Sequence, residues 1–67
     1  MPITLKYDLQ GACEAGHPEH PQTVMEQLGY KVLAFEGHPI FDCVVMEVES
    51  IIEPLPNFLS LTDFVIQ

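Results

Sequence analysis

Two β-prone segments joined by a short link constrain the fold of this chain more than any other feature. Tyr30–Glu36 and Ile40–Glu49 are rich in β-branched and aromatic residues, and Gly37-His38-Pro39 separates them. Short runs of this composition, bounded by glycine and proline, are typical of strands. Gly37 can adopt a positive φ, and Pro39 lacks an amide donor and so suits the start of a strand. The pattern therefore predicts a β-hairpin.

Alternation within the hairpin places apolar side chains on both of its faces. In the first segment, one face is expected to carry Leu33 and Phe35, and the opposite face Tyr30, Val32 and Ala34. In the second segment, one face is expected to carry Ile40, Val44, Met46 and Val48, and the opposite face Phe41, Cys43 and Val45. A strand that is apolar on both faces is typical of the centre of a sheet, covered on each side by the domain or by a partner. Near the end of the second segment, Glu47 and Glu49 share one face, so we expect this end to be half solvated.

The segments before the hairpin predict one strand and one helix. Ile3–Gln10 alternates between apolar and polar residues, which predicts a half-buried strand. Gly11–Pro21 is expected to be a loop, because it contains two glycines and because each residue before a proline is disfavoured in a helix. Pro21–Leu28 is predicted to be a short helix, with Pro21 in its first turn and Gly29 just past its end.

The segments after the hairpin predict a connection and a last strand. Pro54 and Pro56 interrupt any regular element. Thr62–Gln67 predicts a strand, with a helical turn starting at Ser60 as the alternative. The element order β-α-β-β-β predicts an α+β fold: a small four-stranded, mostly antiparallel sheet with one short helix on one face. The other face of the sheet is expected to expose apolar side chains, which favours a homodimer or a partner.

The length of the chain limits its organisation. Sixty-seven residues allow a single small domain, residues 1–67, and about a third of them are Leu, Ile, Val or Phe, so the chain is expected to fold. A domain this small buries only about 60 % of its unfolded surface, which makes a partner useful. The chain has no recognisable signal peptide and no membrane-spanning stretch. We therefore expect a cytoplasmic protein with Cys13 and Cys43 as reduced thiols.

Charge is the strongest compositional signal. The chain has ten carboxylates, two lysines and no arginine, with a net charge of −8. This balance argues against binding to nucleic acid or to an anionic membrane, because phosphate contacts need cations. It favours a basic protein partner, or imitation of nucleic acid in a basic groove. The candidate partner-binding residues are Glu36, Glu47, Glu49 and Glu53. Glu47 and Glu49 are expected to project about 7 Å apart, close to the spacing of alternate phosphates. The alternative is that the acidity serves only solubility.

Cysteine and histidine residues supply a possible metal site. The candidate ligands are Cys13, His17 and His20, with His38 and Cys43 as further members of the set. Zinc is held tetrahedrally by such side chains, and a metal would stabilise a small core. The chain lacks a Cys-x-x-Cys pair and any zinc-finger spacing. The alternative is therefore that the histidines are ordinary loop and turn residues and that Cys43 is a core thiol.

No pattern in the chain indicates catalysis. A nucleophile elbow, a phosphate-binding loop and a His-Glu-x-x-His helix are all missing from the sequence. So short a chain is also expected to have little volume for a substrate pocket of a few hundred Å³. We therefore expect that the protein is not an enzyme.

Three hypotheses for the function follow. The first is a non-enzymatic acidic interaction domain that binds a basic, nucleic-acid-binding surface of a larger protein. In size and charge it is similar to inhibitors encoded by phages and mobile elements, including anti-CRISPR proteins that occupy nucleic-acid grooves. The second is a small zinc-binding module that uses the cysteine and histidine set. The third is a small catalytic or carrier subunit of an oligomer.

Overall fold

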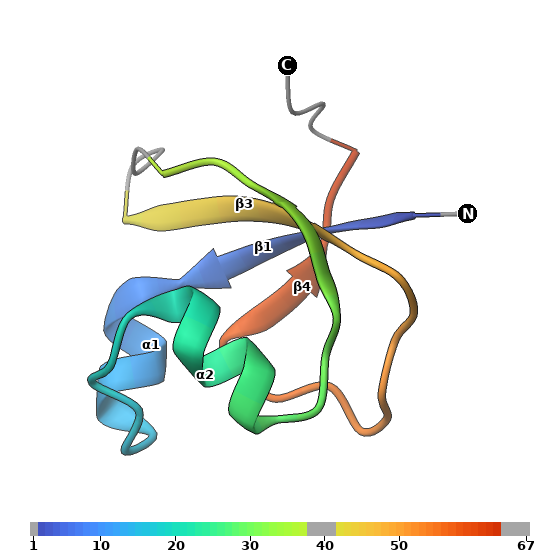
Figure 1. Ribbon diagram of the computed structural model, residues 1–67. Coiled ribbons are helices and arrows are strands. Elements are labelled where there is room, and N and C mark those ends of the chain that lie inside the picture. The colour runs from blue at the N-terminus through green and yellow to red at the C-terminus, as the bar shows by residue number, and fades with distance from the viewer. Residues whose placement is uncertain (1, 38–41, 64–67) are drawn as a thin grey trace.

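The computed structural model describes residues 2–37 and 42–63. Its elements are β1 (Ile3–Asp8), α1 (Leu9–Glu14), α2 (Pro21–Gln27), β2 (Val32–Phe35), β3 (Cys43–Val48) and β4 (Leu59–Leu61). The strands form one antiparallel sheet in the order β2-β3-β1-β4, and α1 and α2 lie together beside it (Figure 1). The predicted small α+β domain with a four-stranded antiparallel sheet is confirmed, with a second helix added.

The two central strands, β1 and β3, form the most buried part of the sheet. Leu5 lies opposite Met46 and Tyr7 lies opposite Val44. These four side chains share one face and are each at most 3 % exposed. The alternation predicted for the first strand is therefore confirmed over β1. The central position predicted for the second strand of the hairpin is confirmed as well.

The core lies between this face of the sheet and the two helices. Its buried members are Leu5, Tyr7, Ala12, Val24, Met25, Tyr30, Val44, Met46, Val48, Phe58 and Leu59. Ala12 comes from α1, and Val24 and Met25 come from α2. Helices of six and seven residues have too few internal hydrogen bonds to persist alone, so this packing is what stabilises them. The helix predicted over Pro21–Leu28 is confirmed almost to the residue.

A shift in register changes the faces predicted for the first strand of the hairpin. Val32 pairs with Val48, and the register then shifts before Ala34, which leaves Leu33 as the extra residue of a bulge. Val32 and Phe35 both pack against the core, whereas Leu33 is 46 % exposed. The prediction that Leu33 and Phe35 share a face is therefore wrong, because an extra residue reverses the alternation beyond it.

Helix α1 occupies much of the segment that was expected to be a loop. The Asp8 carboxylate accepts a hydrogen bond from the Gly11 amide at 3.2 Å and caps the helix. A glycine inside a helix lowers the stability of the helix. Any other residue at position 11 would place its Cβ only 3.3 Å from Cβ of Phe58. The glycine therefore allows α1 to approach the segment before β4. The irregular chain is confined to residues 15–20, where Gly16 has a φ of 92°.

The last described strand begins earlier than predicted. β4 pairs with the edge of β1, so that Leu59 lies opposite Tyr7. Ser60 belongs to this strand, and the alternative of a helical turn starting there is therefore wrong. Of the predicted strand Thr62–Gln67, the first two residues follow β4 in irregular structure, and residues 64–67 lie outside the described residues. His38 and Pro39 of the predicted hairpin link, and the first two residues of the predicted segment Ile40–Glu49, also lie outside the described residues.

The outer face of the sheet, which points away from α1 and α2, is mainly polar over the described residues. Thr4 lies opposite Glu47, and Lys6 lies opposite Ser60 on one side and Val45 on the other. Val45 is itself only 3 % exposed. The large apolar side chains exposed in the described chain are Leu33, Ile52 and Leu61. They belong to β2, the β3–β4 loop and β4, and the expectation that the other face of the sheet exposes apolar side chains stays a prediction.

Candidate acidic pocket

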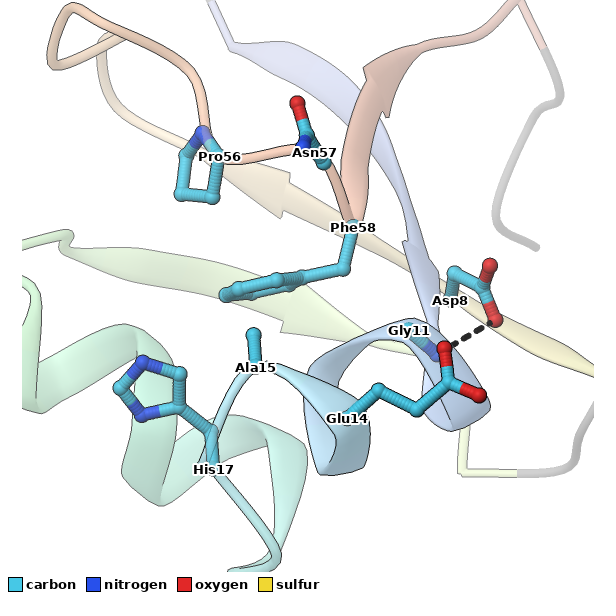
Figure 2. A pocket seen from close by; sticks show the side chains of 8 residues that line it. All are labelled: Asp8, Gly11, Glu14, Ala15, His17, Pro56, Asn57 and Phe58. Carbon is cyan, nitrogen blue, oxygen red and sulfur yellow. Dashed lines mark hydrogen bonds between the residues drawn. The ribbon is translucent and has the colours of Figure 1, made fainter.

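A half-open pocket lies between α1 and the segment that precedes β4. It has a volume of about 590 Å³ and is lined by Asp8, Gly11, Glu14, Ala15, His17, Pro56, Asn57 and Phe58. Figure 2 shows the Phe58 ring at its centre, with His17 toward one end of the ring and the Asp8 and Glu14 carboxylates beyond the other. The volume is in the range of small-molecule sites. The expectation that so short a chain has little room for a pocket is therefore wrong.

Two carboxylates give the pocket its charge. One Asp8 oxygen accepts the Gly11 amide at 3.2 Å, and Oε2 of Glu14 accepts Nε2 of Gln10 at 3.3 Å. The Asp8 contact is partly buried and orients this side chain, whereas the Gln10–Glu14 contact is exposed. Each carboxylate has a second oxygen that can accept a hydrogen bond from a ligand. No lysine lines the pocket, so its field is negative.

Aromatic rings pack behind the pocket. The ring centroids of Phe58 and Tyr7 are 5.3 Å apart with an edge-to-face tilt of 65°, and those of Phe58 and His17 are 5.6 Å apart. The Tyr7 hydroxyl is buried and has no hydrogen-bond partner among the described residues. Burial raises the pKa of Tyr7 above its usual value, and the charges of Cys13 and Glu19 act in the same direction.

The histidines predicted as metal ligands have other contacts in the structure. His17 is half-buried against the Phe58 ring. Nδ1 of His20 accepts the Gln22 amide at 3.2 Å and caps α2, and the His20 ring lies 5.3 Å from that of Phe35. The sequence feature that could have identified this role is the His-Pro pair at the start of the helix, because proline is favoured at the first helical position.

The predicted ligands are not assembled into one site. Cys13 is an exposed free thiol on α1, and Cys43 is a half-buried free thiol at the start of β3. His38 lies outside the described residues. Within residues 2–37 and 42–63, no three His, Cys, Asp or Glu side chains are grouped so that they could hold a metal ion. The structure therefore does not bring Cys13, His17 and His20 together as ligands.

The predicted partner-binding carboxylates occupy two places. Glu47 and Glu49 lie on the outer face of the sheet, because Val48 between them points into the core. Glu36 follows β2, and its amide donates to the carbonyl of Val45, two residues before Glu47, at 2.8 Å. Glu53 belongs instead to the β3–β4 loop, which curves away from the strands and back toward β4 (Figure 1). We call Glu36, Glu47 and Glu49 the sheet region.

Both lysines of the chain also lie on the outer face. Lys6 points outward between the buried Leu5 and Tyr7. Nζ of Lys31 lies 3.5 Å from Oε2 of Glu49. The carboxylates of the sheet region are therefore partly compensated by neighbouring cations.

The helices and their connecting loop form a second acidic region. This helical region consists of Glu14, Glu19 and Glu26, all of them exposed, and residues 9–28 contain no lysine. Asp8, which caps the start of α1, extends this region to the pocket. The pocket lies where the helical region meets the β3–β4 loop. Sequence reasoning missed Asp8 and Glu14 because it did not predict α1. The available signal was Asp8 as a helix cap in front of Leu9–Glu14.

Every carboxylate of the chain is at the surface. All ten Asp and Glu residues lie within the described residues, and none of them is buried. Among the described residues, no helix has the length and apolar character needed to cross a membrane. Comparisons of the chain with protein families, curated proteins and solved structures found no match. The function is therefore argued from the pocket and from the distribution of charge.

Proposed function

We propose that this protein is a non-enzymatic interaction domain that binds a basic surface of a larger protein. The supporting observation is that all ten carboxylates lie at the surface while both lysines lie on the outer face of the sheet. Such a surface attracts cationic partners and repels phosphates. The proposed biological role is inhibition of a nucleic-acid-binding protein, in the manner of small acidic inhibitors encoded by phages or mobile elements.

The proposal allows two contact surfaces. The sheet region, with Glu53, contains the residues identified from sequence. The helical region adds Glu14, Glu19 and Glu26, and it has the more negative field because no lysine shares it. A basic partner that spans several of these carboxylates would release many screening ions on binding, so its affinity would depend steeply on salt.

The test is affinity capture of the partner with the tagged protein, followed by titration of the purified pair. We expect the dissociation constant to rise at least about tenfold between about 50 mM and 300 mM NaCl, because exposed charges are screened at that ionic strength. The partner surface that is protected on binding should be rich in Lys and Arg.

Two double variants with the same change in charge identify the contact surface. One variant, Glu47→Lys with Glu49→Lys, reverses two charges of the sheet region. The other, Glu14→Lys with Glu26→Lys, reverses two charges of the helical region. All four side chains are unburied, so both variants should remain folded by circular dichroism. We expect each to weaken the complex, with the larger effect in the helical region. Unchanged affinity in both variants, or affinity independent of salt, would contradict the proposal.

A further inference from the structure

We propose that the pocket between α1 and the β3–β4 loop receives the guanidinium group of an arginine side chain of the partner protein. This inference rests on the proposed function and deepens it by naming the group that is recognised. The pocket is a half-open cavity at the surface of the helical region, so it can be reached by a side chain that projects from a docked protein.

The size and lining of the pocket suit a long side chain with a charged end. A volume of about 590 Å³ is ample for an arginine side chain. Ala15 and Pro56 supply apolar surface at its rim, against which the methylene groups of the arginine can pack. The Asp8 and Glu14 carboxylates lie together at the other side of the pocket, where the charged end would be placed, and Asn57 lies beside Pro56.

The acceptors favour guanidinium over ammonium. The Gly11 amide holds Asp8, so little freedom of this side chain is lost when a ligand binds, and Glu14 is exposed beside it with one contact to Gln10. Guanidinium carries five N–H donors in a planar fork, which suits donation to two neighbouring carboxylates at once. A lysine ammonium is a compact, strongly hydrated charge with three donors, so we expect it to bind these two carboxylates more weakly.

Neither lysine of the chain is among the residues that line the pocket. Both lysines lie on the outer face of the sheet, away from the pocket lining. Gly11 also keeps the space open, because a Cβ at this position would lie 3.1 Å from Oδ2 of Asp8. The pocket thus combines a negative field, carboxylate acceptors and open volume.

The direct test uses a capped amino acid as probe and amide chemical shifts as readout. N-acetyl-arginine amide is titrated into the ¹⁵N-labelled protein, beside N-acetyl-citrulline amide, which has nearly the same shape without the charge, and N-acetyl-lysine amide. We expect shifts from the arginine probe to concentrate at Gly11, Glu14, Ala15, Asn57 and Phe58. The lysine probe should bind more weakly, and the citrulline probe should leave these amides unshifted.

Matched variants separate the pocket from the general charge. Glu14→Gln should raise the dissociation constant of the arginine probe about threefold to tenfold, because it removes one charge-assisted contact. Glu26→Gln removes the same charge from an exposed position on α2 outside the pocket, and it should change that constant by less than about twofold. Asp8→Asn should act like Glu14→Gln while keeping the helix cap, since asparagine caps as well as aspartate.

Three results would overturn the inference: equal binding of the arginine and citrulline probes, shifts spread evenly over the surface, or equal effects of Glu14→Gln and Glu26→Gln. Free arginine that binds more tightly than the capped probe would also overturn it, because the site would then be one for a free amino acid. If the probe fails while the partner still binds in a salt-dependent way, only the pocket inference falls. If the probe binds but partner affinity ignores salt and charge reversal, the proposed function falls.

Discussion

The two tyrosines show that a buried hydroxyl group can either stabilise or destabilise the fold. Tyr7 and Tyr30 are both buried, at 1 % and 5 % exposure. The Tyr30 hydroxyl donates to the Ile52 carbonyl at 2.9 Å and accepts the Ile52 amide at 3.1 Å, and so ties the β3–β4 loop to the core. The Tyr7 hydroxyl has no partner among the described residues. A buried polar group costs free energy when it is unpaired and stabilises the fold when it is paired.

The same substitution at these two positions should therefore give different results. Tyr30→Phe should lower the free energy of unfolding by about 1–3 kcal/mol, because it leaves two backbone groups of Ile52 unpaired. Tyr7→Phe should leave it unchanged or raise it by up to about 1 kcal/mol. Urea denaturation of both variants at neutral pH measures the difference. A Tyr7→Phe variant as unstable as Tyr30→Phe would show that the Tyr7 hydroxyl has a stabilising contact.

Tyr7 should also make stability depend on alkaline pH. Its pKa in the folded protein is raised, first by burial and then by the charges of Cys13 and Glu19. Below the ordinary pKa of about 10, the phenol is protonated in both states and contributes no pH dependence. Above it the unfolded chain loses this proton first, so stability falls until the folded pKa is passed. Thermal unfolding at rising pH should show a steeper loss in the wild type than in Tyr7→Phe; parallel curves would rule out this contribution.

At the scale of elements, α1 depends on one cap. The helix has only six residues, includes Gly11, and begins directly at the end of β1. Asp8→Ala should lower the free energy of unfolding by about 1 kcal/mol, because the Gly11 amide loses its acceptor. Asp8→Asn is the control and should change it by no more than a few tenths of a kcal/mol. Equal losses in the two variants would mean that the charge of Asp8, and not its capping bond, stabilises α1.

Elements defined by local pattern were predictable, and those defined by distant contacts were not. β1, α2 and the antiparallel hairpin have periodicities and end signals of their own. α1 was missed because Gly11 disfavours a helix locally. The reason for a glycine at this position is the close approach of Phe58, which comes from a distant part of the chain. The bulge at Leu33 was missed because alternation cannot reveal an extra residue, whose place depends on the pairing strand. β4 is short, and its bounds follow from its pairing with β1.

At the scale of the whole molecule, the net charge of −8 should oppose folding. All ten carboxylates are at the surface, so folding brings like charges closer together. Added NaCl should therefore raise Tm, and relief of about 1 kcal/mol corresponds to about 4–8 °C in a domain of this size. A variant with Glu19→Gln, Glu26→Gln and Glu53→Gln should start from a higher Tm and respond less to salt. A Tm that is flat or falls with salt would contradict this expectation.

The candidate site was only partly predictable. The sequence favoured an acidic interaction domain with Glu36, Glu47 and Glu49 as contact residues, which stays a prediction. It did not indicate that Lys6 and Lys31 share their face, or that Glu53 lies apart from them. The pocket could not be predicted from the sequence. Its lining comes from residues 8–17 and residues 56–58, which meet only when α1 packs against the segment before β4.

The sequence by itself determined the fold class, the buried hairpin strand and the excess of negative charge. These follow from composition and from periodicities that act over a few neighbouring residues. Only the tertiary structure decided the strand order β2-β3-β1-β4, the helix at Leu9–Glu14, the side of the sheet on which the lysines lie, and the pocket. Each of these depends on contacts between segments far apart in the chain. Bringing such segments together costs conformational entropy, which is offset only when the whole core forms.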